Sequence, residues 1–262
     1  MKQRLTKKTI AALLAVLLCL SVSIGTAVAY FSDYEEAALK ALLEKQVSGI
    51  IVASVGGCKK IFDRYDKKNT PVVYIDNVPY DTEKYDLVSI DNFSAALSLT
   101  RAIIDKGYTD IGIIIGPRVQ SSSRLRLEGY MKALEERGIE IREEWVREGK
   151  FSLESGYFEM KQVLHAQKKP SAMFFASNKL AYGAIKAIRD EGMCIPKDIA
   201  VVSFDAFDST GLVRPQIVSM NQPAEEIGKT ACKMILEKLS EENHTGEGRV
   251  FLEPYFTDGD SW

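Results

Sequence analysis

Polar and aromatic side chains recur in this chain where buried segments end and helical segments begin. Asp205 is the clearest case, because it directly follows the apolar run 199–204. In open α/β sheets ligands bind beyond the carboxyl ends of the strands, so this carboxylate is placed for recognition. The other members of the set are Asp91, Arg126, Phe151, Ser177, Asn178 and Gln222.

This mix of side chains suits a neutral ligand that is rich in hydroxyl groups. Asp205 and Asn178 can hydrogen-bond to hydroxyls, and Arg126 supplies a planar fork of donors. Phe151 offers an apolar face on which a sugar ring can rest. Taken singly, Asp91 can cap a helix, Arg126 can be a solvated helix charge and Phe151 can belong to the core. Taken together, their positions predict the lining of the cleft of a two-lobed α/β binder.

The sequence contains no recognisable catalytic, cofactor-binding or metal-binding motif. Residues 228–230 resemble the end of a phosphate-binding loop, but Pro223 stands at the position where that loop needs its first glycine. The segment also lies within a predicted helix. No G-x-G-x-x-G follows a strand, and His165 and His244 have no neighbouring nucleophile or ligand pattern. We therefore expect a protein that is not an enzyme and that uses no cofactor or metal.

The composition is that of an ordinary globular protein. The 262 residues are 46% hydrophobic and 27% charged, with a formal net charge of −2, which allows one sizeable core or two smaller ones. This charge balance gives no electrostatic footprint for a nucleic-acid backbone. Beyond residue 29, Cys58, Cys194 and Cys232 are odd in number and match no metal spacing, so we expect buried free thiols.

Residues 1–29, called the leader below, differ from the rest of the chain. Four basic residues within 1–8 precede an uncharged, apolar-rich run over 9–32, which contains the small-x-small pattern 27–29. This order is typical of a secretory signal peptide cleaved after Ala29, and it predicts an exported, extracytoplasmic protein. An uncleaved membrane anchor is the first alternative. The second is a cytoplasmic protein in which 25–31 is a strand preceded by a helix over 8–20, although that helix would lack a polar outer face.

Beyond the leader, helical and extended patterns alternate with short connections. Apolar spacing predicts helices at 35–45, 61–66, 95–106, 121–137, 153–166, 179–191 and 224–239. Apolar runs predict strands at 47–53, 71–76, 87–90, 110–115, 144–149, 172–176, 199–204 and 250–256. Helices between strands indicate βαβ units with parallel sheets, and this many strands favours two lobes. The predicted fold class is α/β with two Rossmann-like lobes.

Several motifs then stand in a fixed order along the chain. They are Asp91-Asn92, Gly107-Tyr108-x-x-Ile111, the R-x-x-G-Y-x-x-A-L pattern within Ser123–Leu134, Gly192–Asp205, and Gln222-Pro223 with Ile227-Gly228. This series resembles the effector-sensing domain of LacI/GalR-type transcriptional regulators, nearly continuously from Asp33 to the C-terminus. The resemblance implies the periplasmic-binding-protein fold, ligand capture between two lobes and closure about a hinge.

The resemblance also implies roles for single residues. Arg126 is similar to the family's pocket arginine, which bonds ligand oxygens, and Asp205 is similar to the acid that grips sugar hydroxyls. Phe151 stands where an aromatic side chain often stacks on the ligand, and Gln222 lies near the crossover to the first lobe. Ser177-Asn178 stands where the family usually has Asn-Asp or Thr-Asp, so one carboxylate of a typical sugar site is missing.

The start of the chain departs from the family pattern. Neither a DNA-reading helix-turn-helix nor the strand that opens the first lobe is recognisable, and the leader stands in their place. We expect no direct nucleic-acid contact from this chain, since it offers no recognition helix for the major groove. A first lobe without its first strand exposes unpaired backbone, so we expect it to be the less stable lobe.

These inferences define the expected organisation and partners. The N-terminal lobe is predicted at 30–90 and 222–246, and the C-terminal lobe at 91–221 and 247–262. The expected partners are a small-molecule effector, namely a sugar, and a second copy of the chain in a homodimer, with membrane contact only through the leader. The alternative function is an exported sugar-binding protein that serves a transporter or receptor.

Overall fold

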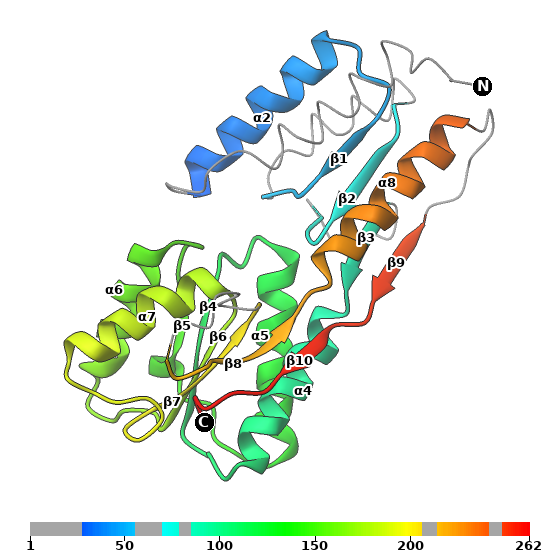
Figure 1. Cartoon of the computed structure of the whole chain (residues 1–262). Helices are drawn as coiled ribbons and strands as arrows, with labels where there is room; N and C mark the ends of the chain where they lie inside the picture. Colours follow the sequence, from blue (N-terminus) through cyan, green and yellow to red (C-terminus); the bar gives the residue numbers. More distant parts are fainter. Residues whose placement is uncertain (1–27, 56–69, 79–84, 206–213, 241–247) are drawn as a thin grey trace. The chain divides into compact units, whose positions relative to one another are not determined.

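The computed structural model describes residues 28–55, 70–78, 85–205, 214–240 and 248–262 (Figure 1). These residues form two compact units. Unit 1 holds the described residues up to Ile90, together with Val119–Ser121 and the described part of Ala224–Leu252. Unit 2 holds Asp91–Arg118, Glu253–Trp262 and the described part of Ser122–Pro223.

Unit 1 is a parallel sheet with a helix on each face. Its elements are the helices α2 (Val28–Glu44) and α8 (Ala224–Ser240) and the strands β1 (Ile50–Val52), β2 (Val72–Ile75), β3 (Asp86–Ile90) and β9 (Arg249–Leu252). The strand order is β1-β2-β3-β9, and each pair is parallel. Ile50 and Val52 pack in the same cluster as Leu39 of α2. Ile51, between them, packs with Ile227 of α8, because successive side chains point to opposite faces of a strand.

Unit 2 contains a wider sheet in the order β10-β8-β7-β6-β4-β5. Its strands are β4 (Ile111–Ile115), β5 (Val146–Glu148), β6 (Ala172–Phe175), β7 (Ala200–Phe204), β8 (Val218–Asn221) and β10 (Tyr255–Thr257). Its helices are α4 (Asn92–Asp105), α5 (Ser121–Glu136), α6 (Leu153–Leu164) and α7 (Asn178–Asp190), with a 3-10 turn η1 at Glu143–Trp145. All paired strands are parallel except β10, which runs antiparallel to β8.

Glycines allow two pairs of helices in unit 2 to approach closely. A Cβ atom at Gly183 of α7 would lie 1.9 Å from the carbonyl oxygen of Leu153 in α6. One at Gly156 of α6 would lie 2.3 Å from the carbonyl oxygen of Leu180. Gly129 of α5 likewise meets the backbone of α4, since its Cβ would lie 2.4 Å from the carbonyl oxygen of Phe93. The hydrophobic core beneath α6 and α7 therefore forms around backbone contacts that any larger residue would push apart.

The C-terminal strand prediction needs correction. The segment 250–256 forms two strands in different sheets, because β9 pairs with β3 and β10 pairs with β8. Glu253 and Pro254 lie between them outside any ladder, and proline has no N–H to donate to one. The predicted lobe bounds therefore differ from the two units at three places. Val119–Ser121 and the described residues 248–252 belong to unit 1 instead of the C-terminal lobe, and Gln222 and Pro223 belong to unit 2 instead of the N-terminal lobe. The sequence also gave no sign of β8, a strand of only 4 residues.

The N-terminal predictions can be compared with the structure only from residue 28 onward. Helix α2 begins at Val28, before the predicted start at residue 35, so the alternative that places a strand at 25–31 is wrong for residues 28–31. The rest of the leader and the predicted helix at 61–66 lie outside the described residues. Within the described ranges, no helix combines the length and the apolar character needed to cross a membrane.

The prediction of buried thiols is wrong for Cys194. That residue is exposed and Cys232 is half-buried, and both are free. Cys194 follows the turn after α7, where its backbone N–H donates to Oδ2 of Asp198 at 2.7 Å. Connecting segments run over the surface, so an apolar residue type there does not by itself imply burial. Cys58 lies outside the described residues.

Candidate functional site

All seven predicted site residues belong to unit 2. Five of its strands are mutually parallel, so their carboxyl ends meet at one side of the sheet, called the carboxyl edge below. Phe151 follows β5, Ser177 and Asn178 follow β6, Asp205 follows β7 and Gln222 follows β8. The sheet therefore brings four separate segments of the chain to the same edge.

Arg126 of α5 is the central residue of this edge. Its side chain is 3% exposed, and it extends across the ends of two neighbouring strands. Nη1 donates to the carbonyl oxygen of Ala176, after β6, at 2.7 Å. The guanidinium carbon lies 3.9 Å from the ring centroid of Phe204, the last residue of β7, a distance typical of cation–π contact. The alternative that Arg126 is a solvated helix charge is therefore wrong, and its role in a ligand site stays a prediction.

Asn92 is a second hydrogen-bond partner of the Arg126 side chain. Nε of Arg126 donates to its Oδ1 at 2.8 Å, and Asn92 is buried at the first position of α4. Asp91, the residue predicted for the site, is exposed and caps α4 by accepting hydrogen bonds from the N–H and the hydroxyl of Ser94 at 3.0 and 2.7 Å. The capping alternative thus describes the contacts of Asp91, and its neighbour is the one that reaches Arg126.

Asp205 and Gln222 form a second polar group on the carboxyl edge. The carboxylate of Asp205 accepts from the backbone N–H of Gln222 at 3.4 Å and from its side-chain Nε2 at 3.3 Å. The Asp205 N–H donates to the carbonyl oxygen of Met220 at 2.7 Å. Its φ of 68° is in the left-handed region, which aspartate tolerates better than most residues. Such sparsely populated conformations cluster at functional sites.

Phe151 lies against the end of β4. Its ring atoms lie 2.1–2.5 Å from the point that a Cβ atom of Gly116 would occupy, so only glycine allows the ring to rest on that strand end. The same side chain packs against the core formed by α6 and α7, and it is half-buried. Phe151 therefore belongs partly to the core while it also borders the carboxyl edge, and its contact with a ligand stays a prediction.

Ser177 and Asn178 begin helix α7. Ser177 is buried and caps the helix, since its Oγ accepts from the N–H of Leu180 at 3.3 Å. Asn178 is half-buried, and no hydrogen bond of its side chain is seen among the described residues. Amide groups both donate and accept, so this side chain is available to a ligand.

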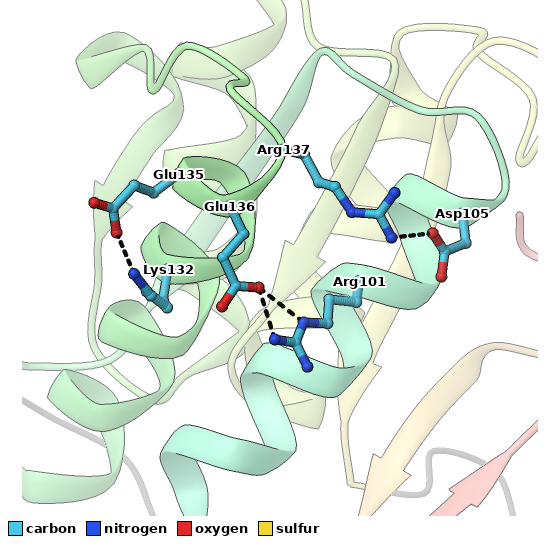
Figure 2. Close-up of polar contacts among 6 residues, drawn as sticks. All are labelled: Arg101, Asp105, Lys132, Glu135, Glu136 and Arg137. Atoms are coloured by element: carbon cyan, nitrogen blue, oxygen red, sulfur yellow. Dashed lines mark hydrogen bonds and ion pairs between the residues drawn. The ribbon is translucent and has the colours of Figure 1, made fainter.

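Ion pairs hold α4 and α5 together, and thereby Asn92 beside Arg126, while a buried phenol ties α5 to the sheet. On the outer side, Arg101 pairs with Glu136 at 2.7 Å and Arg137 with Asp105 at 2.7 Å (Figure 2). Exposed pairs of this kind contribute about 0–1 kcal/mol each. On the inner side, the buried Tyr130 hydroxyl donates to the carbonyl oxygen of Ile111 at 2.7 Å.

Lys132 and Glu135 form a third, fully exposed pair on α5, at 2.9 Å (Figure 2). The hydrogen bond between them raises the pKa of Lys132 and lowers the pKa of Glu135. Burial raises the pKa of Tyr130 well above its ordinary value, so this phenol stays protonated and remains a donor. The hydrogen bond to Ile111 therefore keeps its donor at neutral pH.

The structure thus unites part of the predicted set and adds members to it. Arg126 lies in one polar group, and Asp205 and Gln222 form the other. The two groups are adjacent because Phe204, which contacts Arg126, directly precedes Asp205 in the chain. Sequence reasoning missed Asn92, Gly116 and Phe204. Asn92 stood beside Asp91 in the first of the family motifs, so its polarity at a helix start was a usable signal. Within the described residues, no group of three or more His, Cys, Asp or Glu side chains could hold a metal ion.

Comparison with known proteins identifies the class. The sequence model of the periplasmic binding protein-like domain matches residues 100–262. The HTH-type transcriptional repressor PurR of Yersinia pestis is 34% identical over 215 residues, covering 79% of this chain and 61% of that protein. PurR of Photorhabdus laumondii is 32% identical over 208 residues, with the same two coverages. The chain spans 60–61% of the length of these curated relatives.

Solved structures agree with the sequence relatives. The transcription regulator CcpA of Lactococcus lactis superposes with a TM-score of 0.79 at 26% identity, covering 98% of this chain and 94% of CcpA. The transcriptional regulator CelR in its complex with cellobiose gives a TM-score of 0.77 at 25% identity, covering 97% of this chain and 79% of CelR. The chain therefore belongs to the family of periplasmic binding protein-like domains. The predicted resemblance to LacI/GalR-type regulators and the predicted α/β class with parallel-sheet lobes are confirmed.

Proposed function

We propose that this chain is the small-molecule sensor of a LacI/PurR-type transcriptional regulator, and that its effector is a sugar bound at the carboxyl edge of unit 2. The observation that carries the proposal is the buried guanidinium of Arg126, held by Asn92 and Ala176 across the ends of β6 and β7. A charged side chain is seldom buried unless its hydrogen bonds are provided for, and such groups are common at binding sites.

The other groups at this edge supply what a sugar requires. The carboxylate of Asp205 has capacity for about four hydrogen bonds, and among the described residues its hydrogen bonds come from Gln222. Asn178 adds an amide with both donors and an acceptor, and Phe151 adds an apolar face next to Gly116. Sugars present alternating hydroxyls and C–H faces, so this combination fits them better than it fits a strongly anionic ligand. The CelR relative, solved with cellobiose, supports the same choice.

The sensing step follows from differential affinity. An effector that binds one conformational state more tightly than another shifts the population toward that state, and a difference in affinity is all that such a switch requires. In this proposal the DNA-reading part of the regulator responds to that shift, and this chain supplies the effector site. Catalysis plays no part in the proposal.

Calorimetry on the whole chain tests the proposal. The panel consists of D-glucose, D-galactose, D-ribose and cellobiose, with adenine as a planar ligand that carries no hydroxyl. We expect at least one sugar to bind, and Arg126→Ala and Asp205→Ala each to weaken it more than about 100-fold, since a site built to pair hydroxyls loses its partners. Arg137→Ala, which removes an exposed arginine of the α4–α5 ion pairs, is the matched control and should bind normally. Binding of adenine alone, or unchanged affinity in both site variants, would contradict the proposal.

The exported sugar-binding protein is the alternative, and the leader alone speaks for it, because the curated relatives named above are transcriptional repressors. We propose that residues 1–29 direct export if this candidate holds, with cleavage after Ala29. Mass spectrometry of the mature N-terminus in the source organism separates the two. An intact Met1 in the cytosol supports the regulator, and a chain that begins at Tyr30 outside the cytoplasm supports the exported protein.

A further inference from the structure

One buried polar group of unit 2 takes no part in the contacts of Arg126 or of Asp205. Ser123 of α5 is 0% exposed, and its Oγ has no hydrogen-bond partner among the described residues. A buried hydroxyl that is left unpaired destabilises the folded state, because it gives up its bonds to water without replacing them. Such groups are rare in native structures, and each one calls for an explanation.

Other buried serines of the same unit are paired. The hydroxyl of Ser203 donates to the carbonyl oxygen of Phe204 at 2.8 Å. That of Ser261 donates to the carbonyl oxygen of Val201 at 2.6 Å and accepts from the N–H of Val218 at 2.9 Å. Ser219 donates to Oδ1 of Asn221 at 3.1 Å. The fold of unit 2 therefore provides partners for serines that serve structure, and Ser123 differs from them.

The position of Ser123 on α5 relates it to the candidate site. Residues three apart lie on the same face of a helix, so Ser123 shares the face of Arg126. Tyr130, seven residues after Ser123, lies on this face too, and its hydroxyl donates to the carbonyl oxygen of Ile111 at the amino end of β4. Because α5 follows β4, it starts at the carboxyl edge and runs away from it. Ser123 is thus nearer to the carboxyl edge than Arg126, on the helix face that turns toward the sheet.

We infer that Ser123 is a specificity-determining residue of the effector site, whose hydroxyl pairs with a hydroxyl or another polar group of the effector. The inference rests on the proposed function and adds to it a contact beyond Arg126 and Asp205. Its chemical consequence is selectivity. A buried polar group that pairs with a ligand hydroxyl rejects an analogue that lacks that hydroxyl, because the protein group is then left unpaired.

The test compares the Ser123→Ala variant with Ser261→Ala, each in the whole chain. Both residues are fully buried serines of unit 2, but Ser261 is paired and lies at the start of β7 and β8, away from the carboxyl edge. Stability is measured by urea unfolding and binding by calorimetry. The probes are D-glucose, D-galactose, D-ribose and cellobiose, with 2-deoxy-D-glucose and 2-deoxy-D-ribose as deoxy analogues.

We expect opposite results from the two variants. Ser123→Ala should leave the unfolding midpoint unchanged or raise it, while it weakens the sugar that the wild type binds best by about tenfold or more. It should also reduce the preference of the site for a sugar over its deoxy analogue. Ser261→Ala should lower the unfolding midpoint and leave the affinity within about twofold of the wild type.

Three outcomes are informative in different ways. A lowered midpoint in Ser123→Ala means that its hydroxyl is paired in the free protein, and this overturns the inference whatever happens to the affinity. Wild-type affinity and selectivity in Ser123→Ala overturn it as well, while the proposed function stands if Arg126→Ala still abolishes binding. If the wild type binds none of the sugars, the proposed function itself fails and the inference fails with it.

Discussion

Units 1 and 2 share one layout but use it to different extents. Both place helices against a mostly parallel sheet, yet the described residues form a 4-stranded sheet in unit 1 and a 6-stranded one in unit 2. Among the described residues, the sheet of unit 1 divides the buried apolar side chains into two small clusters, whereas the cluster under α6 and α7 in unit 2 is larger than either. Every residue predicted for the site lies in unit 2. A wide sheet offers more strand ends along one edge, so it brings together more segments that can carry binding groups.

The largest expected effect is a difference in local stability between the two units. Hydrophobic stabilisation grows with the apolar area that is buried, so unit 1 should open at lower free energy than unit 2. We expect amides in β1, β2 and β3 to exchange at least about 100-fold faster than those in β4, β6 and β7. Native-state hydrogen exchange followed by mass spectrometry measures this directly. Equal protection in both sheets would show that the smaller core does not lower the local stability of unit 1.

The second prediction compares one glycine from each unit. Gly183→Ala places a Cβ atom where the Leu153 carbonyl oxygen lies, so α6 and α7 must separate, at a cost of about 1–3 kcal/mol or more. Gly228→Ala in α8 is the matched control, because among the described residues no atom other than those of its chain neighbours and its own helical backbone lies within 4 Å of the added Cβ. Alanine is the better helix former, so this control should gain about 0.5–1 kcal/mol. Urea unfolding reads both changes, and a stable Gly183→Ala variant would mean that the α6–α7 crossing is loose.

The smallest expected effect concerns Tyr130 and pH. Tyr130→Phe removes the hydrogen bond to Ile111 and should cost about 1 kcal/mol at neutral pH. The folded-state pKa of this phenol is raised, so its contribution is fully present below about pH 10 and is lost as the pH rises further, where the unfolded chain ionises first. We therefore expect the wild type to lose stability above about pH 10 more steeply than Tyr130→Phe does. Unfolding midpoints between about pH 8 and 11 measure the difference, and parallel curves would contradict the assignment.

The candidate site was predictable as far as it depends on strand ends. Asp205 could be selected because it follows a predicted strand. Gln222 was selected from its place before the helix predicted at 224–239, since the strand that precedes it was not recognised. Arg126 was selected by its type and motif, but its partner Asn92 was passed over in favour of the neighbouring Asp91. Gly116 could not be found, because its role is to leave room for the ring of Phe151, and that requirement exists only once β4 and the segment after β5 lie side by side.

The sequence by itself determined the alternation of helices and strands, the α/β class and the family, because apolar spacing and ordered motifs are local properties of the chain. The tertiary structure decided which strands are neighbours. It put β9 in the sheet of unit 1 and β10 in that of unit 2, and it placed Arg126 across β6 and β7. Strand pairing depends on contacts between residues far apart in the chain, and a stretch of a few apolar residues does not encode which edge it will join.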